Sequence, residues 1–177
     1  MTMNLFDNLA DVELRQEQLG PGATVLRQFA VPEETALLSA LEDVIDPVSS
    51  LPWPQMPDAF LRLATGAAAQ AGFSEYVPDA CLINRYELGA RLSLHQDKNE
   101  QDIDQPIVSV SLGIPAVFLF GGLNRADKAI RVKLTHGDVV IWGGPARLRY
   151  HGVLPLKEGH HPLVGDYRIN LTFRKAA

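Results

Sequence analysis

The pattern that most constrains the fold of this chain is a run of short strand-like segments from Ala80 to the C-terminal residues. Each is rich in β-branched and aromatic residues, and turn residues such as Gly113-Ile114-Pro115 and Gly143-Gly144-Pro145 separate them. The segments predicted to be strands are residues 80–86, 91–95, 107–112, 116–120, 130–134, 138–142 and 168–173. Strands and helices do not alternate regularly, which argues against a parallel doubly wound sheet. An antiparallel sandwich or jelly-roll barrel is expected.

The N-terminal third has helical periodicity instead. Pro32, Glu33 and Glu34 suit a first helical turn, and the helix should end near Asp46-Pro47. The apolar residues at helical spacing are Leu37, Leu38, Leu41, Val44 and Ile45. A second helix is predicted for about residues 58–71, closed by Gly72. Its buried side should carry Phe60, Leu61, Leu63 and Ala67.

Length and composition favour a single domain for residues 1–177, with helical support in residues 1–79 and the strands in residues 80–177. The predicted class is mainly β (α+β). No apolar run approaches the roughly 20 residues of a membrane helix, so no membrane partner is expected. Residues 1–11 are acidic and lack the apolar core of a secretory signal. Because Cys81 is the single cysteine, no internal disulfide can form, and a cytoplasmic location is expected.

The net charge of −5 argues against a protein that coats nucleic acid by bulk attraction. The charge is uneven: residues 1–90 hold 4 Lys and Arg against 13 Asp and Glu, whereas residues 91–177 hold 12 against 8. The basic half contains a set of cations that either forms a phosphate-facing rim or is an ordinary solvated surface. These cations are Arg125, Lys128, Arg131, Lys133, Arg147 and Arg149.

A candidate metal site begins with His95 and Asp97. On an extended strand, residues two apart point to the same face, so this pair would present an imidazole beside a carboxylate. His151 is the better third ligand, because His160 and His161 lie in a loop and His136 precedes a tight turn, where they look more solvated. Two histidines and one carboxylate form the facial triad of non-heme Fe(II) oxygenases. The alternative is a strand histidine and a turn aspartate without a metal.

The C-terminal strand alternates strictly. Arg168, Asn170, Thr172 and Arg174 share one face, and apolar residues form the other. The polar face points either to solvent or into a barrel that holds an anionic ligand. Two arginines around an asparagine suit a dicarboxylate, because guanidinium groups bind carboxylates bidentately. Asn84 and Tyr86 share a face of an earlier strand and could donate hydrogen bonds to the same ligand. Trp142 is interpreted as a core aromatic rather than a stacking platform.

Five ordered segments together closely resemble the bacterial AlkB family of DNA repair dioxygenases. They read DACLINRY from Asp79, LSLHQDK from Leu92, IVSVSLG from Ile107, HGDVVIWGG from His136 and RINLTFR from Arg168. The resemblance covers most of the chain. It implies a double-stranded β-helix, or jelly roll, as the catalytic core in residues 80–177, with a substrate lid before it.

The resemblance also implies a site and a reaction. His95, Asp97 and His151 would hold Fe(II). Arg174 would pair with the carboxylate next to the keto group of 2-oxoglutarate, and Arg168 with the far carboxylate, helped by Asn84, Tyr86 and Asn170. Family members use O2 and 2-oxoglutarate to hydroxylate a methyl group on a damaged base nitrogen, and the product loses formaldehyde. The expected substrates are 1-methyladenine and 3-methylcytosine in single-stranded DNA, with RNA as an alternative, and the expected state is a monomer. Exposure of the base requires flipping or a single strand.

Two departures from the family pattern concern substrate binding. The lid interval is short, spanning only about residues 46–52, so either substrate is gripped weakly or the sequence lacks a segment. Asn99 stands where the family usually has an aspartate that contacts the damaged base, and an amide both donates and accepts. Base preference should therefore shift. Lys98 and Arg125 match positions near the nucleotide or its phosphate.

Two alternatives stay open at this point. The same iron chemistry could act on RNA or on a protein, which the short lid interval favours. A metal-binding jelly-roll module without turnover is the second alternative. Retention of both arginines argues against it, because such a module has no need for a dicarboxylate site.

Overall fold

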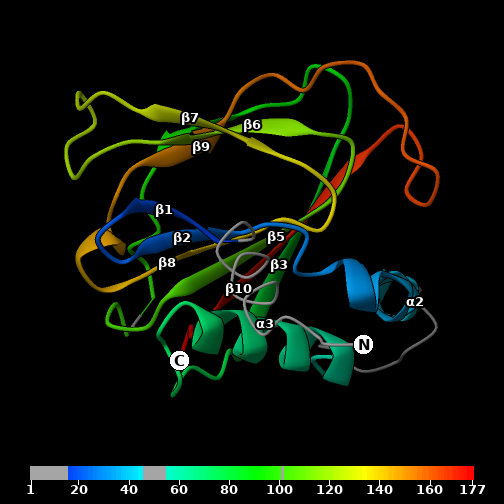
Figure 1. The fold of residues 1–177 in the computed structure, drawn as a ribbon, viewed down its shortest axis with the longest axis horizontal. Coiled ribbons are helices and arrows are strands. Elements are labelled where there is room, and N and C mark those ends of the chain that lie inside the picture. The colour runs from blue at the N-terminus through cyan, green and yellow to red at the C-terminus, as the bar shows by residue number, and fades with distance from the viewer. Residues whose placement is uncertain (1–15, 46–54, 101) are drawn as a thin grey trace, which may run out of the picture.

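The computed structural model describes residues 16–45, 55–100 and 102–177, and the predicted lid interval lies outside them. Two antiparallel sheets face each other, and two helices cover the outer side of the larger sheet (Figure 1). This arrangement agrees with the expected sandwich or jelly roll. None of the described helices is long and apolar enough to cross a membrane.

The larger sheet has six strands, in the order β1-β2-β8-β5-β10-β3. Their bounds are β1 Gln16–Gly20, β2 Ala23–Leu26, β8 Val139–Trp142, β5 Ile107–Gly113, β10 Arg168–Arg174 and β3 Ala80–Tyr86. The smaller sheet has four, in the order β4-β9-β6-β7. Its strands are β4 Leu92–His95, β9 His151–Val153, β6 Ala116–Phe120 and β7 Ile130–Leu134.

The seven predicted strands are all present, with ends shifted by no more than one residue. Strands β1, β2 and β9 were not predicted. β1 has the largely polar sequence QEQLG, and β9 has only three residues, so neither carries an alternating pattern. Pairing with neighbouring strands, rather than local sequence, makes them strands.

The N-terminal helix has two parts, the 3-10 turn η1 (Val31–Glu33) and α2 (Glu34–Ile45). Leu37 and Leu41 are buried, whereas Ile45 is 63% exposed although it follows the same helical spacing. Ile45 is the last described residue of α2, beyond the part of the helix that packs on the sheet. Helix α3 (Asp58–Gln70) is followed by Gly72 at φ +93°, the left-handed conformation expected after a helix end.

Two apolar clusters lie on opposite faces of the larger sheet. The first joins Phe60 and Leu63 of α3 to Leu171 and Phe173 of β10, which are fully buried. Burial of each large side chain contributes about 1.5–3 kcal/mol. The second cluster lies between the sheets and includes Trp142, Phe118 and Phe120. Trp142 is 1% exposed, in agreement with its interpretation as a core aromatic.

Candidate metal and cosubstrate site

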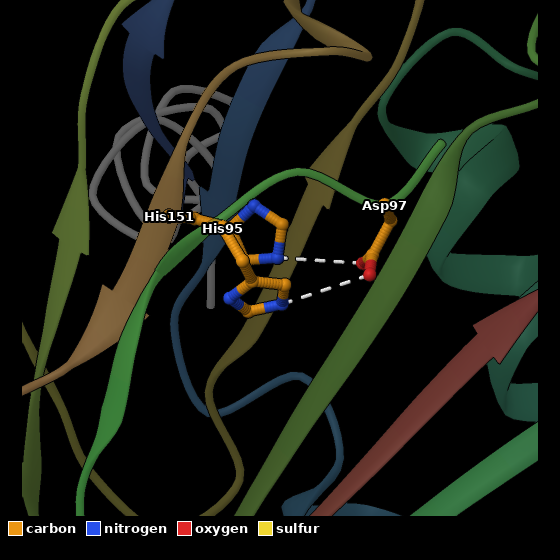
Figure 2. A group of neighbouring side chains, drawn as sticks. All are labelled: His95, Asp97 and His151. Carbon is orange, nitrogen blue, oxygen red and sulfur yellow. Dashed lines mark ion pairs between the residues drawn. The ribbon is translucent and has the colours of Figure 1, made fainter. Parts of the chain in front are cut away.

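His95 and His151 are brought together by strand pairing. His95 ends β4, His151 begins β9, and the two residues are direct partners in the antiparallel register. Their ring centroids lie 4.3 Å apart. Asp97 approaches both rings, with Oδ1 3.6 Å from Nε2 of His95 and Oδ2 3.3 Å from Nε2 of His151 (Figure 2). One potential ligand atom from each residue lies within 4.8 Å of the others. The predicted triad therefore converges.

The backbone fixes the same tautomer in both histidines. Nδ1 of His95 lies 2.9 Å from the carbonyl oxygen of Ser93, and Nδ1 of His151 lies 3.1 Å from that of Arg149. Because a carbonyl only accepts, each Nδ1 carries the proton and donates it. Each Nε2 is then the ring nitrogen that faces Asp97 and is left to bind a metal.

Asp97 is 8% exposed and lies beyond the end of β4, so the same-face argument for strand residues does not place it. A hydrogen bond of 2.5 Å from Nη1 of Arg147 to its carbonyl oxygen holds its backbone. Burial acts to raise the pKa of Asp97, but the imidazole of His151 and the guanidinium of Arg174 outweigh it, and the pKa is lowered. Oδ2 is buried, and no described residue donates a hydrogen bond to it. An ionised carboxylate beside the Nε2 atoms of two histidines fits a metal cation.

Gly152 follows His151 and lets β4 and β9 approach closely. A Cβ atom at this position would lie 2.6 Å from the carbonyl oxygen of Leu92 and 3.2 Å from the amide nitrogen of Leu94. Both contacts are with the backbone of β4, which cannot rotate away. The absence of a side chain at Gly152 therefore allows β4 and β9 to hold His95 and His151 close together.

A cavity of about 140 Å³ adjoins the triad between the two sheets. Its lining includes the predicted cosubstrate residues from β3 and β10, which are Asn84, Tyr86, Arg168, Asn170 and Arg174. The polar face of β10 thus points into the molecule, whereas its apolar face packs toward α3. Of the two orientations considered for this strand, the interior one is confirmed.

Arg168 is a buried cation with unused donors. Its side chain is 2% exposed, and Nη2 donates to Ser111 Oγ at 3.0 Å, but Nε and Nη1 have no partner among the residues that the structure describes. Its guanidinium lies 5.0 Å from the ring centroid of Tyr86. Burial lowers the pKa of Arg168 and raises that of Tyr86. An arginine keeps its charge even so, and leaving buried charge-bearing donors unpaired is costly. These donors fit a carboxylate.

Asn170 is fully engaged within the sheets. Its Nδ2 donates to Ser109 Oγ at 2.8 Å and to the Val110 carbonyl at 2.9 Å, and its Oδ1 accepts from Thr172 Oγ1. Asn170 is therefore placed to shape the cavity wall rather than to offer a free N–H. Asn84 lines the cavity as predicted.

The residues predicted to contact substrate are not part of the cavity wall. Lys98, Asn99 and Arg125 are exposed on loops. The proposed basic rim is wrong for Arg147, which is 3% exposed. Its guanidinium is directed into the protein by the carbonyls and the carboxylate that it binds, so it cannot face a phosphate.

Sequence reasoning missed Ser109 and Ser111, which support Asn170 and Arg168. The signal was present, because two serines two residues apart interrupt an apolar strand and indicate a polar interior face.

The rejected rival histidines do not join the triad. His136 is not solvated as expected: its ring stacks on that of His161 at 4.0 Å, its Nδ1 accepts the Gly113 N–H, and Nε2 donates to Glu34.

Comparison with known proteins agrees with this donor set. The family model described as "2OG-Fe(II) oxygenase superfamily" matches residues 16–174. The chain is 45% identical to the alpha-ketoglutarate-dependent dioxygenase AlkB of Salmonella typhimurium, over 98% of this chain and 99% of that protein. A DNA N(6)-methyladenine demethylase, ALKBH1A of Arabidopsis thaliana, is 40% identical over 59% of this chain and 31% of its own length. The solved structure of OsALKBH1 has a TM-score of 0.78 and 27% identity, covering 90% of this chain and 99% of that one.

The Salmonella match extends over 213 residues, whereas 98% of this chain is about 173, so the relative has about 40 residues without a counterpart here. The structural likeness to OsALKBH1 confirms the jelly-roll fold. The donor set fits Fe(II) at the triad and a dicarboxylate at Arg168. The chain belongs to the 2OG-Fe(II) oxygenase superfamily and, within it, to the bacterial AlkB family of dioxygenases, which depend on Fe(II), 2-oxoglutarate and O2.

Proposed function

We propose that this dioxygenase removes methyl groups from 1-methyladenine and 3-methylcytosine in single-stranded DNA, releasing formaldehyde. The observation that carries the proposal is the pair of unpartnered donors on buried Arg168, in the same cavity as the His95, Asp97 and His151 triad. A dicarboxylate cosubstrate beside a two-histidine, one-carboxylate metal site is the requirement of this chemistry. When bound, Fe(II) and 2-oxoglutarate supply the oxidation of a methyl C–H bond by O2.

In this proposal the metal is bound at one end of the cavity and the far carboxylate of 2-oxoglutarate at the other. His95, Asp97 and His151 hold Fe(II), with Nδ1 of each histidine anchored on a backbone carbonyl. Arg168 binds the far carboxylate of 2-oxoglutarate beside Tyr86, and Arg174 binds the carboxylate next to the keto group. Asn84 contributes a hydrogen bond, whereas Asn170 holds Ser109 and the strand in place.

The substrate enters from the exposed side of the triad. The side chain of His95 is 35% exposed, whereas that of His151 is 6% exposed, so the approach to the metal is open next to His95. Lys98 and Asn99 follow Asp97 on the same exposed loop and are proposed to contact the nucleotide. Arg125 lies on the loop between β6 and β7 and is proposed to meet the DNA backbone. A base must leave a duplex to reach this position, which favours single strands.

The test is formaldehyde release and base restoration on single-stranded oligonucleotides that carry one 1-methyladenine or one 3-methylcytosine. The wild-type chain should restore both bases, and His95→Ala should restore neither. Asn99→Asp should change the ratio of the two rates without abolishing either. The substitution alters the hydrogen bonds that residue 99 can offer the base, and it leaves the three metal ligands unchanged. An RNA oligonucleotide of the same sequence serves as the competing substrate.

Faster turnover on RNA than on DNA would identify RNA as the substrate. Restoration of the bases by His95→Ala would overturn the metal assignment. Succinate formation without repair of any methylated oligonucleotide would keep the iron chemistry and move the substrate to another class, such as a protein.

A further inference from the structure

Arg147 joins the two segments that carry the metal ligands. It follows the 3-10 turn η2 (Gly144–Ala146) and precedes His151 by four residues. Nη1 donates to the Asp97 carbonyl at 2.5 Å, Nε to the Gln105 carbonyl at 2.9 Å and Nη2 to Glu100 Oε2 at 3.1 Å. All three guanidinium nitrogens of Arg147 thus donate hydrogen bonds to residues of the loop that follows His95.

Glu100 extends this link to β10. Its side chain is 5% exposed, and its second oxygen, Oε1, accepts a hydrogen bond of 2.9 Å from Nη1 of Arg174. One buried carboxylate therefore bridges two guanidinium groups, Arg147 from the segment before β9 and Arg174 from the end of β10. The bridge neutralises the repulsion that two nearby cations would otherwise exert.

The contacts of Arg174 occupy two of its three guanidinium nitrogens. Nη1 is held by Glu100, and Nη2 lies 3.0 Å from Oδ1 of Asp97. Nε is buried and has no partner in the described part of the chain, and the residue lines the cavity. Because a guanidinium is a rigid plane, fixing Nη1 also fixes the direction of the edge formed by Nε and Nη2.

We propose that Glu100 and Arg147 are positioning residues for both the cosubstrate and the metal. Glu100 orients Arg174 so that its Nε edge meets the carboxylate of 2-oxoglutarate, and Arg147 fixes Glu100 and the backbone of Asp97. Without Glu100, Asp97 is the remaining carboxylate partner of Arg174, and the arginine competes with the metal for it. The inference rests on the proposed site for 2-oxoglutarate and goes beyond it, because neither residue touches the cosubstrate.

The experiment measures 2-oxoglutarate binding without turnover and without nucleic acid. Mn(II) replaces Fe(II), and the dissociation constant of 2-oxoglutarate is measured by isothermal titration calorimetry. Glu100→Gln keeps the side-chain volume and removes the charge, and should weaken binding at least tenfold. Glu100→Asp keeps the charge and should recover part of the loss. Arg147→Lys, which keeps one cation but loses the planar fork, should weaken Mn(II) binding at least fivefold.

Glu42→Gln, an equivalent change on the exposed side of α2, is the matched control and should bind as the wild type. Thermal unfolding of each variant separates misfolding from misorientation: a folded Glu100→Gln with the same affinity as the wild type overturns the inference. In turnover assays, Glu100→Gln should raise KM for 2-oxoglutarate more than it lowers kcat. An increase confined to KM for the oligonucleotide would instead make Glu100 a substrate contact and overturn the inference. Failure of the wild type to bind 2-oxoglutarate would overturn the proposed function itself.

Discussion

His95 and His151 are direct cross-strand partners, and their imidazole rings lie 4.3 Å apart with both protonated nitrogens turned to backbone carbonyls. The position of the metal is therefore set by strand register. The two Nε2 atoms and the carboxylate of Asp97 converge, so a metal bound there contacts groups that the fold has already brought together. Metal binding should consequently be linked to stability.

Mn(II) should raise the free energy of unfolding by about 2.7 kcal/mol at a hundred times its dissociation constant, because it binds the folded state alone. Thermal unfolding with and without Mn(II) measures the effect, and a chelator should reverse it. His151→Ala should abolish the shift. An equal shift in that variant would locate the metal elsewhere.

Arg168→Met should have opposite effects on stability and binding. Removing this buried cation, whose Nε and Nη1 have no partner among the described residues, should stabilise the ligand-free protein by about 2 kcal/mol, since methionine fills the space without a desolvation cost. The same change should remove the increase in unfolding temperature caused by 2-oxoglutarate. Chemical denaturation and thermal unfolding in the presence of the cosubstrate measure the two effects. A destabilised variant that still binds 2-oxoglutarate would contradict the proposed role.

Cys81 should resist alkylation in the folded protein. Burial raises the pKa of its thiol to about 12, against an opposing hydrogen bond from the backbone of Thr172. Since the thiolate is the reactive form, iodoacetamide at pH 8 should label the native chain on the order of a thousandfold more slowly than the denatured chain. Mass spectrometry gives both rates without ambiguity, because the chain has one cysteine. Similar rates would mean that β3 opens readily.

His161 should make stability fall at mildly acidic pH. Burial and the neighbouring His136 lower its pKa, although Glu34 acts in the opposite direction. As pH falls through about 6.5, the unfolded chain takes up a proton at this position before the folded chain does, so unfolding becomes more favourable. His161→Phe keeps a ring stacked on His136 and should lose stability less steeply between pH 7.5 and 5.5. Equal slopes from denaturant unfolding would exclude His161 as the cause.

The sequence predicted the parts of the fold that have a local pattern. Strand β10 alternates between Arg168, Asn170 and the apolar residues between them, and the structure places these two sets on opposite faces. The two helices were likewise evident from their spacing. Strand β9 was missed because three residues cannot display a period, although it supplies His151.

The sequence could not reveal what Arg147 does. In the sequence, Arg147 is one of several nearby cations, so it was grouped with a basic surface. Its contacts with Glu100 and Gln105 join residues more than 40 positions apart in the sequence. Such a contact depends on how β8, η2 and the loop after β4 fold together. Likewise, Asn170 was expected to bind the ligand, but only its neighbours Ser109 and Thr172 reveal that its amide is already occupied.

The missing side chain at Gly152 has a consequence for the variation that this enzyme can tolerate. Even alanine would push β4 outward by the width of a methyl group and separate the two imidazoles that must share one ion. Random mutagenesis selected for repair should therefore recover no replacement at residue 152, while the neighbouring exposed loops accumulate changes. The separation of the two iron-binding histidines therefore depends on the absence of a Cβ atom at residue 152.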